Sequence, residues 1–101
     1  MSILEINLKN PITDDEINGI KSKLTAAKNF EYLIIDTGKH DFASISVIKF
    51  FREQMVSLES YLLKFKKIAL IHPAEYKNES SNPQYYDYFI SKHEAKKWFV
   101  K

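Results

Sequence analysis

Apolar residues recur along the chain with two different periods, and these periods predict short strands separated by helices. Near the start, Leu4, Ile6 and Leu8 alternate with polar residues, which is typical of a half-buried strand. Later apolar runs are compact and bounded by polar residues, as in strands buried inside a sheet. The predicted strands cover residues 4–8, 32–35, 68–71 and 85–90.

The first helix is predicted over residues 13–25, and its start carries several signals. Thr13 is the expected N-cap, and Glu16, three residues later, completes a capping box. Ile12 and Ile17 occupy the two positions of a hydrophobic staple. These signals agree on a helix that begins directly after the first strand.

A long second helix is predicted after the second strand, with a bend over residues 57–60. Its core-facing stripe consists of Ile48, Phe51, Met55, Leu58, Leu62 and Phe65. Further apolar residues lie outside this stripe: Val47, Phe50, Val56, Tyr61 and Leu63. This surplus has three interpretations, namely a second layer of core, a ligand pocket, or a face through which two copies form a homodimer.

A last helix follows the fourth strand, with Ser91 and Glu94 as a second capping box and Ala95, Trp98 and Phe99 facing the core. Residues 74–84 are expected to form a surface loop. The order is therefore β-α-β-α-β-(loop)-β-α in a single domain over residues 1–101. Right-handed crossovers between successive strands predict an α/β fold with a mostly parallel four-stranded sheet covered by helices.

Composition narrows the class of protein. The chain has 101 residues, of which 45% are hydrophobic and 28% charged, and its net charge is only +2. It has no cysteine, and no apolar run approaches the roughly 18 residues that span a bilayer. The first ten residues lack the layout of a signal peptide. We therefore expect a cytoplasmic protein without stable membrane insertion.

The two glycines rule against a phosphate-binding loop, because Gly19 lies inside the first helix and Gly38 in the turn after the second strand. We expect Gly38 to supply a positive φ there, and we predict no cofactor.

Seven lysines cluster near helix ends, close to several aromatic residues, a pattern found in proteins that bind single-stranded nucleic acid. However, Phe89 and Trp98 occupy expected core positions, so we predict no nucleic-acid binding.

Parallel strands bring their carboxyl ends to one edge, and polar residues gather there. Asp36, His40 and Asp41 follow the second strand, and His72 follows the third. A histidine beside carboxylates can act as a general base or bind a metal. The histidines lack the close spacing of metal ligands, and no G-x-S-x-G elbow is present. We therefore predict neither catalytic residues nor a metal site.

Three segments carry a resemblance to a known family. They are LIIDTGKHDF followed by an amphipathic helix, LLKFKKIALIHP, and YFISKHEAKKWF. Together they resemble STAS domains, and most closely the SpoIIAA-like branch of anti-sigma-factor antagonists, which is also similar to lipid-carrying modules. The resemblance implies a non-enzymatic signalling domain whose protein partner is an anti-sigma factor, a serine kinase or another signalling protein.

The resemblance also implies a phosphorylation site. In the family an Asp-Ser-Ser-Gly signature opens the second helix, and its second serine is phosphorylated. Matching Asp36 to the aspartate that ends the strand places Ser46 on that serine and Ser44 on the signature's aspartate. Only one of the four positions is kept, so the signature is degenerate. The other interpretation is that Ser44 and Ser46 are N-cap or first-turn serines.

The leading hypothesis is a regulatory protein-interaction domain whose partner surface lies within residues 38–49. The predicted site residues are Ser46, Ser44, Gly38, His40, Asp41 and Lys49, together with Asp36 at the end of the preceding strand. The alternative is a carrier or sensor of a small nonpolar ligand held between the second helix and the sheet. A weaker alternative is a small hydrolase or a metal site at the strand-end edge.

Overall fold

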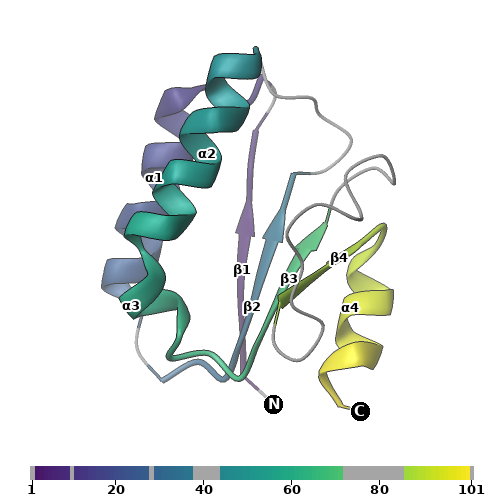
Figure 1. Cartoon of the computed structure of the whole chain (residues 1–101). Helices are drawn as coiled ribbons and strands as arrows, with labels where there is room; N and C mark the ends of the chain where they lie inside the picture. The colour runs from purple at the N-terminus through teal and green to yellow at the C-terminus, as the bar shows by residue number, and fades with distance from the viewer. Residues whose placement is uncertain (1, 10, 28, 38–43, 72–85, 101) are drawn as a thin grey trace.

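The computed structural model describes residues 2–9, 11–27, 29–37, 44–71 and 86–100 (Figure 1). Its strands are β1 (Ile3–Asn7), β2 (Tyr32–Asp36), β3 (Lys67–Ile71) and β4 (Tyr86–Phe89). Its helices are α1 (Asp14–Ala26), α2 (Ile45–Ser57), α3 (Glu59–Leu62) and α4 (Lys92–Phe99). None of these helices is long and apolar enough to cross a membrane.

The four strands form one sheet in the order β1-β2-β3-β4, and every neighbouring pair is parallel. Ile6 pairs with Ile35, Ile35 with Leu70, and Leu70 with Tyr88. The prediction of a mostly parallel four-stranded sheet is confirmed. The carboxyl ends of β2 and β3 therefore lie at the same edge, where polar residues were expected to gather.

The helices cover the two faces of the sheet unequally, as Figure 1 shows. α1, α2 and α3 lie on one face, and α4 lies on the other. The strand order advances in one direction from β1 to β3, so right-handed crossovers place α1 and α2 on the same face. Because side chains alternate along a strand, Leu33 and Ile35 face these helices while Ile34 faces α4.

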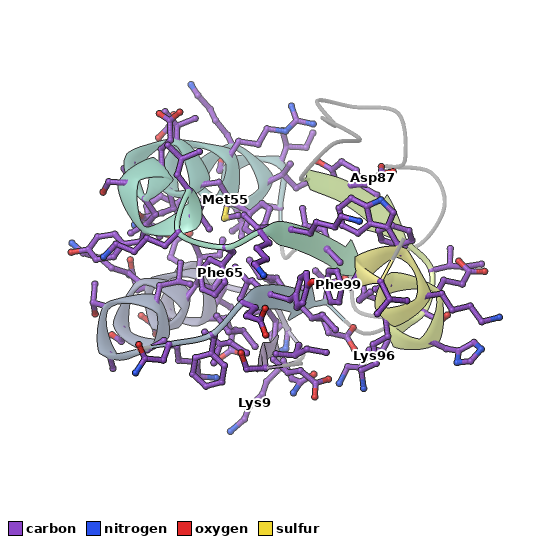
Figure 2. All side chains as sticks on the ribbon, turned by 90° about the horizontal axis from the view of Figure 1, so that it is seen from below. Lys9, Met55, Phe65, Asp87, Lys96 and Phe99 are labelled. Carbon is purple, nitrogen blue, oxygen red and sulfur yellow. The ribbon has the colours of Figure 1, made fainter. Side chains whose placement is uncertain are left out.

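Two apolar clusters hold the layers together, and Figure 2 shows Met55 and Phe65 in one and Phe99 in the other. The larger cluster joins strand residues to α1, α2 and α3, and it includes Ile6, Ile17, Ile20, Leu33, Ile35, Phe51, Leu62 and Ile68. The smaller cluster joins β2 and β3 to α4, where the rings of Tyr32 and Phe99 stack with centroids 4.6 Å apart. Each fully buried side chain of this kind contributes about 1.5–3 kcal/mol.

The long second helix is broken near its end. α2 stops at Ser57 and α3 begins at Glu59, with the buried Leu58 between them. The predicted bend is confirmed. The surplus of apolar residues proves to be mostly core, because Val47 is buried and Phe50 and Tyr61 pack against the larger cluster. Only two of the five surplus residues, at positions 56 and 63, are largely exposed.

The prediction of a capping box at α1 is wrong, because the expected side-chain hydrogen bonds do not form. Thr13 is the N-cap residue, but its side chain accepts no capping hydrogen bond. The Glu16 carboxylate instead accepts a hydrogen bond from the backbone N–H of Lys9. The staple residues Ile12 and Ile17 are both completely buried in the larger cluster, as expected.

In the second predicted box, Ser91 is the N-cap of α4, and its Oγ accepts a hydrogen bond of 3.2 Å from the N–H of Glu94.

Candidate functional site at the start of α2

The carboxyl edge of the sheet is where α1, α2 and α4 all begin (Figure 1). Of the seven predicted site residues, the structure describes Asp36, Ser44, Ser46 and Lys49. The other three, Gly38, His40 and Asp41, lie outside the described residues, as does His72. The site is therefore built from the end of β2 and the first turn of α2.

Asp36 is a structural residue at the end of β2. Its Oδ2 lies 3.5 Å from the Nζ of Lys92, the first residue of α4. The same ammonium group lies 3.2 Å from Oε1 of Glu5 and donates a hydrogen bond of 2.8 Å to Oδ1 of Asn7. Asp36 therefore helps to tie β1 and β2 to the start of α4.

Sequence reasoning missed this role of Lys92, which it grouped with the lysines near helix ends. The alternation of side chains along β1 and β2 could have indicated this role. Glu5 and Asn7 pair with Ile34 and Asp36, so all four project from the face of the sheet that α4 covers. A lysine at the start of α4 is long enough to reach the acidic groups among them.

The backbone at this edge is fixed by Thr37, a buried polar residue that is only 2% exposed. Its Oγ1 donates a hydrogen bond of 2.7 Å to the carbonyl oxygen of Ile71, and its N–H donates one of 3.1 Å to the same atom. The N–H of Leu8 donates to the carbonyl oxygen of Asp36 at 2.9 Å. The strand ends next to the site are therefore held firmly together.

The first turn of α2 combines a buried anchor with an exposed outer surface. Ser44 is the N-cap, and its Oγ accepts a hydrogen bond of 3.3 Å from the N–H of Val47, which is buried. This confirms the interpretation of Ser44 as a capping residue. On the outside, Ile45 is 85% exposed, and Ser46 and Lys49 are exposed as well. Because they are three and four residues apart, Lys49 is a neighbour of both Ser46 and Ile45 on the helix surface.

The start of α2 differs in charge from the starts of α1 and α4, which lie at the same edge of the sheet. The first turn of α2 has no acidic residue, whereas that of α1 has Asp14, Asp15 and Glu16, and that of α4 has Glu94. The unpaired N–H groups at a helix start carry partial positive charge, which negative groups in the first turn compensate. At α2 no side chain of its own first turn does so, and Ser46 occupies the second helical position there.

The catalytic and metal alternatives can be followed only at Asp36, because the histidines they need lie outside the described residues. Among the described residues, no group of three or more His, Cys, Asp or Glu side chains is placed to hold a metal ion. The Asp36 carboxylate contacts a lysine instead. The predictions of no catalytic residue and no metal site stay predictions.

Some of the basic and aromatic residues near helix ends contact one another or an acidic group of the fold. Lys67 Nζ donates a hydrogen bond of 2.7 Å to the carbonyl oxygen of Trp98 and lies 5.0 Å from the centroid of its ring. Trp98 in turn packs on Phe89, with ring centroids 5.1 Å apart. Lys66 pairs with Glu31 at 2.8 Å. For Lys66, Lys67 and Trp98, the pattern therefore reflects contacts within the fold.

Comparison with known proteins identifies no relative. No protein-family model, curated protein or solved structure matches the chain. The resemblance to STAS domains therefore rests on the residues of this chain alone.

Proposed function

We propose that this protein is a non-enzymatic regulatory domain that binds another protein through the first turn of α2, residues 44–49. The observation that carries the proposal is the 85% exposure of Ile45 beside an exposed serine and an exposed lysine. Protein interfaces combine an apolar centre with a polar rim. Within one helical turn, Ile45 supplies the apolar group, and Ser46 and Lys49 supply polar and charged ones.

A rigid support favours this surface as a binding site. Ser44 caps the helix, while Val47 and Phe51, both buried, fix the first turns to the core. Side chains presented from such a turn lose little backbone freedom when a partner binds, which lowers the entropic cost of association. An exposed isoleucine adds almost nothing to the stability of the fold, so a role in binding would account for it.

The regulatory part of the proposal is phosphorylation of Ser46. A phosphate group carries about −1.5 to −2 charges at neutral pH and binds well at a helix start. Ser46 is exposed in a first turn without acidic residues, and Lys49 lies one turn further on. Phosphorylation would place that charge next to Ile45 and change the affinity for the partner. The resemblance to STAS domains suggests an anti-sigma factor or a serine kinase as the partner.

Site-specific photo-crosslinking in the cells that produce the protein tests the binding surface. Benzoylphenylalanine replaces Ile45 in one variant and Val100, which is 70% exposed at the end of α4, in the control. We expect a discrete protein adduct from position 45 and none from position 100. Identical adducts from both positions, or none from position 45, would refute the proposed surface.

The regulatory step has its own test. Mass spectrometry of the protein isolated from its native cells should find phosphate on Ser46 and none on Ser60, an exposed serine of α3. In addition, Ser46→Asp should change the yield of the position-45 adduct severalfold, while the uncharged Ser46→Asn should not. An unmodified Ser46, with both variants behaving alike, would remove the switch and leave the binding surface in place.

A further inference from the structure

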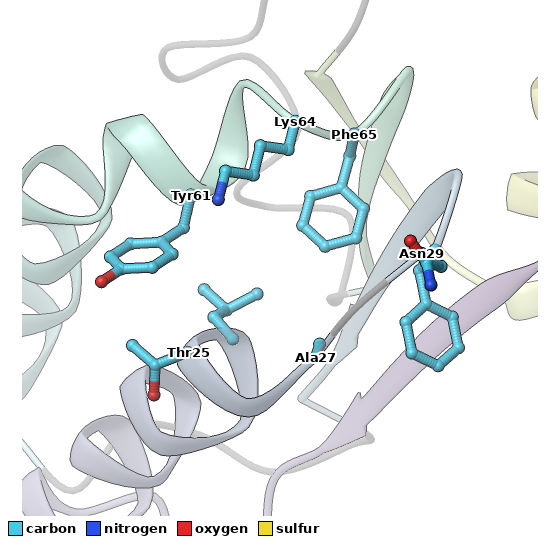
Figure 3. Close-up of a pocket in the computed structure, with 8 residues that line it drawn as sticks. Thr25, Ala27, Asn29, Tyr61, Lys64 and Phe65 are labelled. Carbon is cyan, nitrogen blue, oxygen red and sulfur yellow. The ribbon is translucent and has the colours of Figure 1, made fainter.

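A second candidate site lies at the opposite edge of the sheet, between the end of α1 and the segment that joins α3 to β3 (Figure 3). It is a pocket of about 180 Å³ that is partly open to solvent. Leu24 and Thr25 of α1 line one side, and Tyr61, Lys64 and Phe65 line the other. Tyr61, Lys64 and Phe65 belong to the stretch predicted as the second helix, but the facing wall is the end of α1 and the segment after it. The pocket therefore differs from a ligand site between that helix and the sheet.

The volume of the pocket limits what it can hold. Sites for drug-sized ligands measure about 300–1,000 Å³, which is well above the volume seen here. A cavity of about 150 Å³ is sufficient for one benzene molecule. At about 180 Å³, the pocket therefore fits a single aromatic ring with a short substituent.

The walls of the pocket suit an aromatic ring. Leu24 forms an apolar floor and is only 3% exposed, while Tyr61 and Phe65 are half-buried. Phe30 adds a third ring at the rim and is 36% exposed. Aromatic rings attract one another in offset or edge-to-face arrangements, beyond the effect of burying their area. A bound ring would cover apolar surface that now faces solvent.

Hydrogen bonds hold the backbone of the strand edge behind the pocket, so this wall of the pocket does not need a ligand to form. Asn29 adopts a positive φ of 65°, which turns the chain from α1 toward β2. Ser2 Oγ donates to the carbonyl oxygen of Asn29 at 3.4 Å and accepts from the N–H of Glu31 at 3.0 Å. The N–H of Lys66 donates to the carbonyl oxygen of Glu31 at 2.7 Å. A preformed site of this kind avoids the cost of ordering on binding.

Charge at the pocket is asymmetric. Lys66 pairs with Glu31, and this hydrogen bond lowers the pKa of the Glu31 carboxyl and raises the pKa of Lys66. Lys64 has no such carboxylate partner in the described part of the chain, and its Nζ lies 5.4 Å from the centroid of the Tyr61 ring. The opposite side of the pocket is the carboxyl end of α1, whose carbonyl groups carry partial negative charge, while Lys23 supplies a positive charge in the same last turn. Among the described residues that line the pocket, Lys64 carries the full positive charge, so a negative group of a ligand belongs beside it.

We propose that this pocket binds a small aromatic carboxylate, with the ring between Leu24 and Phe65 and the carboxylate beside Lys64. The site is at the opposite edge of the sheet from the start of α2, so the proposal does not depend on the proposed function. A ligand of about ten heavy atoms in a partly open pocket gives a dissociation constant on the order of millimolar.

Nuclear magnetic resonance titration of the full chain tests the proposal with three probes. Phenylacetate carries both ring and charge, phenylacetamide keeps the ring without the charge, and acetate keeps the charge without the ring. Phenylacetate should shift the amide signals of Leu24, Thr25 and Phe65, and those of residues 45–49 should stay unchanged. It should bind about twofold to fivefold more tightly than phenylacetamide, the range expected for an exposed ion pair, and acetate should produce no saturable shift.

Matched lysine variants assign the charge effect. Lys64→Met should remove the preference for phenylacetate over phenylacetamide. Lys96→Met should retain it, because Lys96 is an exposed residue of α4 on the other side of the sheet (Figure 2). Equal affinities for the two compounds in the unmodified chain would overturn the proposal. The absence of saturable shifts at the pocket with phenylacetate in the tens of millimolar would also overturn it.

Discussion

Two helices of this protein start at the same edge of the sheet, on the same face and in contact with each other, yet their starts are built differently. At α1, Ile12 and Ile17 are completely buried, and three acidic residues occupy the first turn. At α2, the first helical residue, Ile45, is 85% exposed, and the first turn has no acidic residue. At α2, therefore, the first turn lacks the acidic residues found at α1, and its isoleucine faces solvent instead of the core.

The difference indicates that the start of α1 serves stability, whereas the start of α2 is available for recognition of a partner. Buried isoleucines and first-turn carboxylates both stabilise a helix start, so α1 needs no further partner. At α2, stability comes from the Ser44 cap and from residues deeper in the helix, such as Val47 and Phe51. Ile45 and Ser46 are therefore free to change without loss of the fold, as a surface that recognises a partner requires.

The largest expected effect compares the isoleucines at the two starts. Ile12→Ala should lower the free energy of unfolding by about 2–5 kcal/mol, because it removes a fully buried side chain and leaves a cavity. Ile45→Ala should change it by less than about 0.5 kcal/mol, as is usual for exposed positions. Urea denaturation measures both values. Similar losses of stability in the two variants would mean that Ile45 is as well buried as Ile12.

A smaller effect compares the two N-cap residues. The Ser44 hydroxyl accepts a hydrogen bond from the N–H of Val47, whereas the Thr13 side chain makes no capping bond. Ser44→Ala should therefore cost about 1 kcal/mol, within the range for lost caps, and Thr13→Ala should cost clearly less. Thermal unfolding of the two variants side by side measures the difference. A larger loss at Thr13 would show that the hydroxyl bonds the helix start in solution.

Much of this architecture was predictable from sequence because periodicity reports burial. The runs at 32–35 and 68–71 became β2 and β3. Asp36 extends β2 at its carboxyl end and Lys67 extends β3 at its amino end, because each pairs with the last or first residue of the neighbouring buried run. The break in the second helix at Leu58 lies within the bend predicted over residues 57–60. Ile45 lies three residues before Ile48, in phase with the core-facing stripe, so the period alone does not predict its 85% exposure.

Features that depend on tertiary packing could not be predicted. The capping box of α1 failed because the Glu16 carboxylate bonds to Lys9, a residue of the preceding connection, rather than to the N-cap. The pocket joins Phe30 and Phe65, which are far apart in the chain and meet only because β2 and β3 are neighbours. The order of strands, and the face on which α4 lies, are set by connections that carry no local signal.

The smallest expected effect compares the charges at the two starts. Ser46→Asp should raise the free energy of unfolding by about 0.3–1 kcal/mol at low salt, because it places a negative charge in the first turn of α2, which has no acidic residue of its own. Ser46→Asn is the neutral control, and Asp14→Asn should lower stability by a similar amount because it removes such a charge from α1.

Both charge effects should shrink at 0.5 M salt, since exposed charges are screened at that ionic strength. Urea denaturation of the three variants at low and high salt measures the differences. If Ser46→Asp matched Ser46→Asn at low salt, the start of α2 would not favour negative charge. Phosphorylation of Ser46 would then have to act on a partner alone, without support from the helix that carries it.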